Sequence, residues 1–482
     1  MSHRDSLVLS SSTQDRNELR RQVSATMDAI MASYDDESAF SGMDPFELRR
    51  RIQAIDVLPD SGLGFDDTLT TVAREVLPHM LRTWSVDYMP HLHAPSLMES
   101  ISSELIIGTY NDSMDSWDQS PAATEVELSV IRCLCTLFGY DGNADGCFTS
   151  GGSQSNLSGI IAARDAWCMK RLGHDVKRHG NPDIWPRMRL YTSEISHFSM
   201  DKSCHLLGLG HDAVVKLRVD DRCRIDIDQA RRIIERDVEA GLLPFCIVAT
   251  IGTTDFGSVD DIAALRLIAD RYGAHLHADA AYGSGAIMSR RYRERIGDLS
   301  LADSITVDFH KMFLLPISCS AILVKDASIL GCFELHADYL NRQEDEEDGY
   351  VNLVDKSIQT TRRADALKVL ISFMTHGRDG YERMIDTVIG NADHFHSRIS
   401  GDEDFICPVA PTLSSVVFAL RDGDEVNRAV RRALLSSGTV IGQTVKDGRV
   451  MLKFTLLNPA LTHEHIDRLI ERIKAFRDRL KP

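Results

Sequence analysis

Short apolar runs alternate with stretches of helical periodicity between about residues 91 and 375, and this alternation constrains the fold more than any other feature. The expected strands are Met188–Thr192, Phe245–Ile251, His275–Ala278, Ser304–Val307 and Ala321–Val324, and the helices expected between them are Asn156–Arg171, Ile227–Ala240 and Ile262–Tyr272. Strands that alternate with helices predict an α/β architecture, in which helices cover both faces of a mainly parallel sheet.

The segments on either side of this region have different patterns. Residues 1–90 are polar, with amphipathic periodicity in 16–34 and 67–84, and predict an N-terminal helical segment that packs against another surface. Residues 376–482 predict a small α+β domain, with strands at Leu413–Leu420 and Val450–Leu457 and helices at Asp424–Leu435 and His463–Leu480. The chain is therefore expected to divide into three parts, 1–90, 91–375 and 376–482.

Charge and composition exclude several kinds of partner. Lys and Arg total 54 against 71 Asp and Glu, a formal net charge of −17, which argues against nucleic acid or an anionic membrane as the main partner. No apolar run approaches the ~20 residues that span a bilayer, and no secretory signal is visible. The ten cysteines lie mostly in apolar stretches, and Cys133 and Cys135 have no second pair at zinc spacing. We therefore expect a cytoplasmic protein without a metal site.

A run of small and hydroxyl-bearing residues at 149–156 directly precedes an expected helix. It includes Ser150, Gly151, Gly152 and Ser153, whose small side chains let a ligand approach the backbone closely. Because a helix start presents unpaired N–H groups, this position suits a phosphate. The alternative is an ordinary Ser/Gly turn with a serine cap, since the run matches neither the P-loop nor the G-x-G-x-x-G motif.

An aspartate, Asp279, follows the expected strand His275–Ala278. Ligands of open α/β sheets bind beyond the carboxyl ends of the strands, so this carboxylate is expected to face a crevice. The small residues Ala280, Ala281 and Gly283 favour a site that admits a flat group. The alternative is that Asp279 only caps a helix.

A lysine, Lys311, follows the expected strand Ser304–Val307 within the run Asp308-Phe309-His310-Lys311. Its apolar neighbours would desolvate the amine and make it available as a nucleophile for a carbonyl. The alternative is a solvated surface lysine. A phosphate cradle, a carboxylate and a lysine in this order are what pyridoxal 5'-phosphate requires: an anchor for its phosphate, a partner for its pyridinium nitrogen and a Schiff-base amine for its aldehyde.

These motifs resemble the group II pyridoxal-phosphate decarboxylases, over about residues 85–460. The resemblance implies fold type I, the aspartate aminotransferase-like fold with a seven-stranded sheet, and a homodimer with active sites at the interface and the N-terminal segment in dimer packing. It implies that Lys311 binds the cofactor covalently and that Asp279 pairs with the ring nitrogen. The remaining cofactor-binding residues that it implies are His197, stacked on the ring, Ser150, Gly151, Gly152, Ser153 and His310 around the phosphate, Thr254 and Ala281 at the ring, and Asp308.

Within this family the chain is most similar to siderophore-pathway decarboxylases of lysine or L-2,4-diaminobutyrate. The residues that carry this likeness are 115–120, 336–341, 355–363 and 452–459. It implies a substrate site that includes Asp115, Asp118, Tyr339 and Arg363. The two carboxylates, Asp115 and Asp118, would supply the counter-charge that a desolvated ammonium group needs. The alternative for Asp118 is a cap on the following helix.

We expect conversion of L-lysine to cadaverine for siderophore biosynthesis. The alternatives are L-2,4-diaminobutyrate to 1,3-diaminopropane, ornithine decarboxylation and, more distantly, an aromatic amino acid decarboxylase or another fold type I enzyme such as an aminotransferase. The alternative without enzymatic activity is a protein of this fold that only binds the cofactor.

The acidic run 344–348 predicts that 338–355 forms an exposed mobile loop. The resemblance implies that such a loop closes over the site and that a loop tyrosine protonates the substrate Cα. Tyr350 is the expected proton donor, and Tyr339 is expected to line the substrate pocket.

Overall fold

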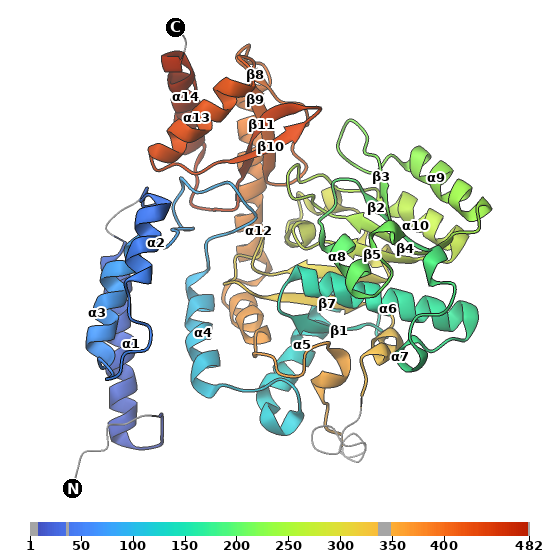
Figure 1. The fold of residues 1–482 in the computed structure, drawn as a ribbon, viewed down its shortest axis with the longest axis horizontal. Coiled ribbons are helices and arrows are strands. Elements are labelled where there is room, and N and C mark those ends of the chain that lie inside the picture. The colour runs from blue at the N-terminus through green and yellow to red at the C-terminus, as the bar shows by residue number, and fades with distance from the viewer. Residues whose placement is uncertain (1–7, 35–37, 336–348, 481–482) are drawn as a thin grey trace.

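The computed structural model describes residues 8–34, 38–335 and 349–480, and the described part contains a seven-stranded and a four-stranded sheet (Figure 1). The strands of the large sheet are β1 (Asp145–Thr149), β2 (Met188–Ser193), β3 (Val214–Leu217), β4 (Leu243–Thr250), β5 (His275–Asp279), β6 (Ser304–Asp308) and β7 (Ser320–Val324). Their spatial order is β1-β7-β6-β5-β4-β2-β3. Strands β3, β2, β4, β5 and β6 run parallel, whereas β7 is antiparallel to both of its neighbours. The predicted mainly parallel, seven-stranded α/β sheet is confirmed.

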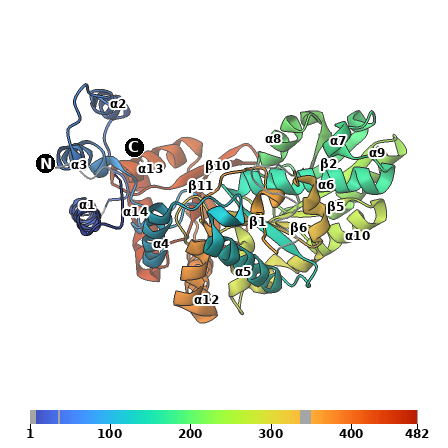
Figure 2. The same cartoon turned by 90° about the horizontal axis from the view of Figure 1, so that it is seen from below.

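Helices pack on both faces of the large sheet, as Figure 2 shows for α6 and α8 on one side and α5 and α10 on the other. The described α-helices are α1 (Thr13–Ala32), α2 (Pro45–Gln53), α3 (Phe65–Glu75), α4 (Met98–Tyr110), α5 (Pro121–Leu137), α6 (Gly152–Leu172), α7 (Val176–His179), α8 (Ser199–Leu206), α9 (Ile227–Glu239), α10 (Ile262–Tyr272), α12 (Ala366–Ile399), α13 (Asp424–Ser436) and α14 (His463–Leu480).

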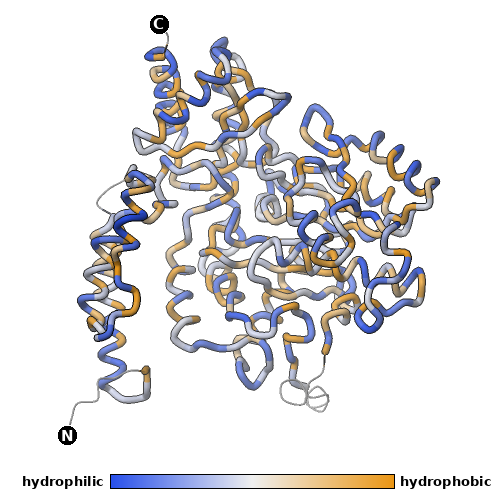
Figure 3. Tube along the Cα trace, in the orientation of Figure 1, coloured by the Kyte–Doolittle hydropathy of each residue, from blue (hydrophilic) through white to orange (hydrophobic). Residues whose placement is uncertain are grey.

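The central strand β4 shows why both faces must be covered. Ile247 and Ala249 belong to the core beneath α5, α9 and α10, whereas Cys246 and Val248 belong to the core beneath α6 and α8. Successive side chains of a strand point to opposite faces, so a continuous apolar run buries apolar surface on both sides. The covering helices are amphipathic, and hydrophobic and hydrophilic stretches alternate along α9 in Figure 3.

The four-stranded sheet lies in the C-terminal part of the chain and is antiparallel throughout. Its strands are β8 (Phe405–Ile406), β9 (Ser415–Leu420), β10 (Gly442–Lys446) and β11 (Arg449–Thr455). Helices α13 and α14 pack on it together with the second half of α12 (Figure 1). Gly377 interrupts α12 with a φ of 57°, a left-handed conformation that glycine adopts without a steric penalty.

The N-terminal helices α1, α2 and α3 lie along one side of the molecule, beside α4 and away from the large sheet (Figure 1). The helix observed in the predicted range 67–84 is shorter than expected. Helix α3 ends at Glu75, and only a turn of 3₁₀-helix follows at Leu77–His79. Pro78 lies in that turn, and proline lacks the N–H that would continue an α-helix. None of the described helices is both long and apolar enough to cross a bilayer.

The prediction of an exposed loop at 338–355 is wrong for its C-terminal part. Residues 338–348 lie outside the described residues, but Asn352 and Leu353 are buried. Leu353 belongs to an apolar cluster with Ile107, Met114 and Ala364, which anchors this end of the segment to the body of the protein.

Candidate active site

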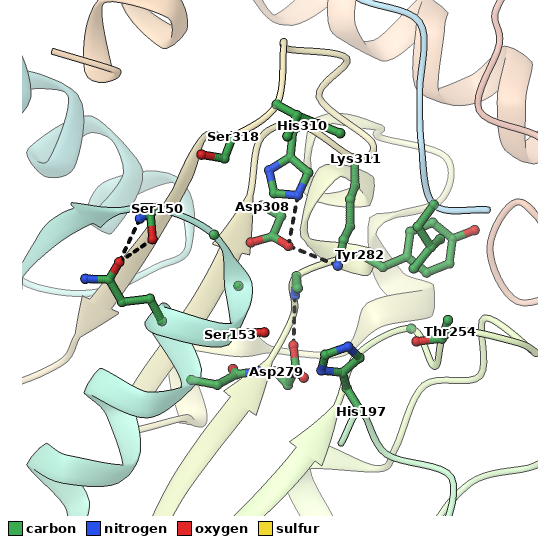
Figure 4. Close-up of a pocket in the computed structure, with 18 of the residues that line it drawn as sticks. Ser150, Ser153, His197, Thr254, Asp279, Tyr282, Asp308, His310, Lys311 and Ser318 are labelled. Carbon is green, nitrogen blue, oxygen red and sulfur yellow. Dashed lines mark hydrogen bonds and ion pairs between the residues drawn. The ribbon is translucent and has the colours of Figure 1, made fainter. Parts of the chain in front are cut away.

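A cavity of about 360 Å³ lies at the carboxyl ends of the central strands (Figure 4). Thr250, Asp279 and Asp308 are the last residues of β4, β5 and β6, and all of them line this cavity. The cavity also includes every residue predicted to bind the cofactor: Ser150, Gly151, Gly152, Ser153, His197, Thr254, Asp279, Ala281, Asp308, His310 and Lys311. The parallel strands therefore bring together side chains that lie far apart in the sequence.

Lys311 follows β6 by one short turn and extends toward Asp279 and His197 (Figure 4). Its Nζ lies 2.9 Å from Asp308 Oδ2, and its side chain is 19% exposed. Asp308 is buried, and its other oxygen accepts a hydrogen bond of 2.6 Å from Ser320 Oγ. The apolar flank expected from the sequence is present, since Phe309, Met312 and Phe313 are buried. The ammonium group is thus held at the cavity wall by a fixed carboxylate.

His310 lies on the same wall. Its Nε2 is 3.5 Å from Asp308 Oδ2, and its Nδ1 lies 2.9 Å from the carbonyl oxygen of Cys319. Burial lowers the pKa of His310 below its usual value, because desolvation disfavours the imidazolium.

Asp279 and His197 form the opposite side of the cavity (Figure 4). Asp279 is buried, and its Oδ2 accepts a hydrogen bond of 3.0 Å from Asn156 Nδ2. Burial lowers the pKa of His197, although the nearby Asp279 carboxylate partly opposes this shift. A neutral imidazole therefore faces the cavity near a buried carboxylate at neutral pH.

The N-terminus of α6 closes a third side of the cavity. Gly151 precedes the helix with no side-chain cap, so the first N–H groups of α6 are available to a ligand. A Cβ on Gly152 would lie 2.7 Å from Asp308 Oδ2, so only glycine fits between the helix start and that carboxylate. Ser153 points into the same space (Figure 4). Together with the positive end of the helix, these groups suit a phosphate.

Several residues that line the cavity were not predicted as site residues, namely Leu92, Gln154, Asn156, Thr250, Gly252, Tyr282, Ile317 and Ser318. Asn156 and Tyr282 belong to the sequence motifs, but their roles depend on partners distant in the chain. The hydroxyl of Tyr282 lies at hydrogen-bond distance, 2.7 Å, from Ser414 Oγ, and no local sequence pattern reveals this contact. Among the described residues, no partner reaches the buried hydroxyl of Thr250, which leaves a polar atom for a ligand.

Three of the predicted substrate residues, Asp115, Asp118 and Arg363, do not line this cavity. Asp118 lies in a 3₁₀ turn and accepts a hydrogen bond of 2.6 Å from Ser116 Oγ. The alternative role of Asp118 as a helix cap is wrong, because α5 begins at Pro121 without a side-chain cap. Asp115 is buried and accepts from the N–H of Ser116.

Arg363 and Tyr350 also lie outside the cavity. Arg363 pairs with Glu104 and lies 3.7 Å from Asp365. The ring of Tyr350, 41% exposed, packs 4.9 Å from that of Trp117. Tyr339 lies outside the described residues.

The "Pyridoxal-dependent decarboxylase conserved domain" matches residues 53–421, and the chain belongs to this family. An L-2,4-diaminobutyrate decarboxylase from Rhizobium meliloti (strain 1021) is 35% identical over 465 residues, which cover 95% of this chain and 90% of that protein. Another, from Acinetobacter baumannii, is 35% identical over 470 residues, 94% of this chain and 91% of its own length.

Solved structures agree with this placement. The glutamate decarboxylase domain of a diaminobutyrate-pyruvate transaminase and L-2,4-diaminobutyrate decarboxylase from Vibrio parahaemolyticus superposes with a TM-score of 0.90 at 34% identity, covering 98% of each chain. The protein is thus a pyridoxal-phosphate-dependent amino acid decarboxylase with the type I fold. The helix start, the glycine-sized gap and the opposed lysine and aspartate fit this cofactor.

Proposed function

We propose that the protein decarboxylates L-2,4-diaminobutyrate to 1,3-diaminopropane. The observation that carries the proposal is a single cavity in which Lys311, Asp279 and the start of α6 face one another. The diaminobutyrate decarboxylases with 35% identity over nearly the whole chain support this substrate. They favour it over L-lysine, the substrate first expected from the sequence.

Each side of the cavity has a distinct role in this proposal. Lys311 binds the cofactor covalently, Asp279 accepts a hydrogen bond from its ring nitrogen, and the N–H groups at the start of α6 bind its phosphate together with Ser153. When bound, pyridoxal phosphate supplies a sink for the electron pair released at the substrate Cα. The carboxylate of Asp279 would hold the proton on the ring nitrogen.

The protein also controls where protons and water reach the reacting carbon. Neutral His197 packs on the cofactor ring without placing a second positive charge beside Lys311. Asp308 holds the Lys311 amine, and His310 lies on the other side of the same carboxylate oxygen. Tyr350 is the proposed proton donor to Cα, and it is 41% exposed at the surface beside Trp117.

We infer further that the protein is a homodimer whose active sites lie at the subunit interface. Helix α4 exposes the large apolar side chains Met98, Ile101, Leu105 and Tyr110, and Met98 and Tyr110 are 83% and 77% exposed. Exposed apolar surface of this kind supports burial against a second chain. Asp118 and Tyr350 lie outside the cavity of their own chain, so in this proposal they serve the site of the partner subunit.

A substrate panel tests the proposed reaction. The holoenzyme is assayed for CO₂ release and for keto-acid formation with L-2,4-diaminobutyrate, ornithine, lysine, aspartate and tryptophan. We expect CO₂ release without a keto acid and the highest kcat/KM for diaminobutyrate. A higher kcat/KM for lysine would restore the longer diamino acid as substrate, and a preference for tryptophan would refute a cationic side-chain site.

A further inference from the structure

Asn156 lies at the centre of a buried hydrogen-bond network behind Asp279. Its Nδ2 donates to Asp279 Oδ2 and to Ser199 Oγ, each at 3.0 Å, and its Oδ1 accepts from Thr306 Oγ1 at 2.7 Å. An ionised carboxylate can only accept hydrogen bonds, so the Asn156 atom that faces Asp279 must be the amide nitrogen. The orientation of the Asn156 amide is therefore determined by its surroundings.

The orientation of the Asn156 amide determines which ring nitrogen of His277 carries a proton. The Nε2 atom of His277 lies 3.0 Å from Asn156 Oδ1 and must donate to it. Burial lowers the pKa of His277 to about 3, so the ring is neutral and its Nδ1 is an acceptor. Nδ1 lies 2.8 Å from Ser304 Oγ, which in turn lies 2.8 Å from His275 Nε2. Each group in this series therefore donates a hydrogen bond to the next, in the order His275, Ser304, His277, Asn156 and Asp279.

The Asn156 amide also influences, through Ser199, which ring nitrogen of His197 carries a proton. Because Ser199 Oγ accepts a hydrogen bond from Asn156, its own proton is available to His197 Nδ1, 2.9 Å away. The backbone N–H of Ser199 also points at this Nδ1, at 3.3 Å. Both contacts make Nδ1 an acceptor, so the neutral His197 ring carries its proton on Nε2.

Close packing holds this network in position. Helix α6 passes over His277 at Gly159, and a Cβ on Gly159 would lie 2.7 Å from both Cε1 and Nδ1 of the imidazole. Asn156, Thr306 and His277 are all at most 1% exposed. Water therefore does not compete for the donors, and the network has one arrangement.

We propose that Asn156, held by His277 and Thr306, is a positioning residue that directs a carboxylate oxygen of Asp279 at the cofactor's ring nitrogen and sets the tautomer of His197. The inference rests on the proposed placement of Asp279 beside that nitrogen. His277 and Thr306 both hold the Asn156 oxygen, so the Asn156 N–H orients the Asp279 carboxylate before the cofactor arrives, and none of the binding energy is spent on rotating it.

The test compares two cofactors in titrations of the apoprotein: pyridoxal 5'-phosphate and its 1-deaza analogue, which has carbon in place of the ring nitrogen. Asn156→Ala removes a hydrogen bond to a charged group, so we expect it to raise the Kd for pyridoxal phosphate about tenfold. The Kd for the deaza analogue should change less than about twofold, because that analogue does not use the oxygen that Asn156 directs.

Further variants keep the test decisive if Asn156→Ala fails to fold. Asn156→Asp conserves shape but replaces the donor with a second acid, and it should weaken pyridoxal phosphate selectively. His277→Phe fills a similar volume but removes the donor to Asn156, and Gly159→Ala displaces the imidazole ring of His277. Both should raise the Kd for pyridoxal phosphate about threefold. His277→Gln keeps a side-chain N–H and should restore most of the affinity.

The matched control is Asn427→Ala. Asn427 is a buried asparagine that bonds backbone groups of Leu420 and Gly423 in the C-terminal region, far from the cavity lining. Its loss should lower stability and leave the ratio of the two Kd values unchanged. Equal weakening of both cofactors by the Asn156 variants would overturn the positioning role.

Asp279→Ala separates this inference from the proposed function. If Asp279→Ala selectively weakens pyridoxal phosphate and the Asn156 variants do not, the positioning role alone is wrong. If Asp279→Ala weakens both cofactors equally, the placement of the ring nitrogen at Asp279 is wrong as well.

Discussion

Lys311 Nζ lies 2.9 Å from Asp308 Oδ2, and Asp308 is itself fixed by Ser320 from the antiparallel strand β7. The lysine is therefore held by a group that the sheet positions, rather than by its own flexible side chain. The same carboxylate lies beside the Cα of Gly152 at the start of α6. One buried aspartate thus connects the two halves of the proposed cofactor site, the lysine and the phosphate cradle.

Lys311→Ala is expected to lower turnover by more than about 1,000-fold, because no other amine takes its position. The visible absorbance of the bound cofactor should disappear at the same time. The measurements are CO₂ release and an absorbance spectrum after gel filtration. Lys325→Ala, which removes an exposed lysine, is the control. CO₂ release by Lys311→Ala at the wild-type rate would refute the assignment.

Asp118→Ala is expected to raise KM for L-2,4-diaminobutyrate about tenfold or more, as the loss of one counter-charge to an ammonium group would. KM for an uncharged amino acid should change less than about twofold. Steady-state kinetics with both substrates measure the difference. Equal effects on both substrates would eliminate the counter-ion role.

Mixing the Asp118→Ala and Lys311→Ala proteins tests whether the two residues serve one site from different chains. In a dimer with shared sites, half of the dimers are mixed and carry one intact site, so about a quarter of wild-type activity should return at a substrate concentration well below KM, where Asp118→Ala alone should have about a tenth of that activity or less. The mixture is assayed after dissociation and reassociation, and each variant treated alone is the control. No recovery in verified mixed dimers would place both residues in the site of the same chain.

Gly152→Ala is expected to weaken pyridoxal phosphate binding about tenfold. The added methyl would lie 2.7 Å from Asp308 Oδ2, which is buried and cannot move aside cheaply. Fluorescence titration of the apoprotein measures the Kd. Gly142→Ala is the control, since a Cβ there meets nothing within 4 Å. An unchanged Kd would show that the helix start is not part of the cofactor site.

The buried His277 should make the protein less stable in acid. Burial lowers its pKa to about 3 in the folded protein, against an ordinary value of 6.5, so between about pH 6.5 and pH 3 only the unfolded chain takes up the proton. The free energy of unfolding then falls by as much as about 1.4 kcal/mol per pH unit as the pH decreases toward 3.

Urea unfolding of the apoprotein at pH 7 and pH 5 measures this effect. The loss between the two pH values should be smaller by about 2 kcal/mol in His277→Gln than in the wild type. His205→Gln, at an exposed histidine, should behave like the wild type. Identical pH dependence in His277→Gln and the wild type would contradict the low pKa.

The ion pair of Arg362 with Glu127 should contribute strongly to stability when only one partner is lost. Both side chains are nearly inaccessible, with two contacts of 3.0 Å, and Glu127 also accepts from the N–H of Phe148 in β1. Arg362→Met leaves a buried carboxylate unpaired, so we expect a loss of about 3–5 kcal/mol. Urea unfolding measures it, and Arg362→Met with Glu127→Leu should recover much of the loss. If the double variant were no more stable than Arg362→Met, the loss of stability would be due to packing rather than to the unpaired carboxylate.

The central elements were predictable because their signals are local. The strands β2, β4, β5, β6 and β7 and the helices α9, α10, α13 and α14 begin within two residues of the predicted positions. Strands β1 and β3 were missed, since β1 is a short edge strand that contains a glycine and β3 has only four residues. The antiparallel direction of β7 could not be predicted, because a strand's sequence does not encode which neighbour it pairs with.

The candidate site divides in the same way. Motifs of consecutive residues identified Lys311, Asp279, Asp308 and Gly152, and the sheet brings all four to one cavity. Thr250 and Leu92 gave no signal, because their role follows only from where the chain places them. Asp118 and Arg363 were expected at the same site, yet they do not line the cavity of this chain, since likeness to a family does not give a residue's position in space.

The sequence by itself determined the class of fold and the cofactor, and it named the candidate residues of the site, because apolar periodicity and short motifs depend on neighbours along the chain. The tertiary structure alone decided how those residues are oriented. The donor to Asp279 comes from Asn156 in α6, and the donors that hold Asn156 come from β5 and β6. Hydrogen-bond direction is a property of atoms in contact, and Asn156 contacts Asp279, His277 and Thr306, which each lie more than one hundred positions away in the chain.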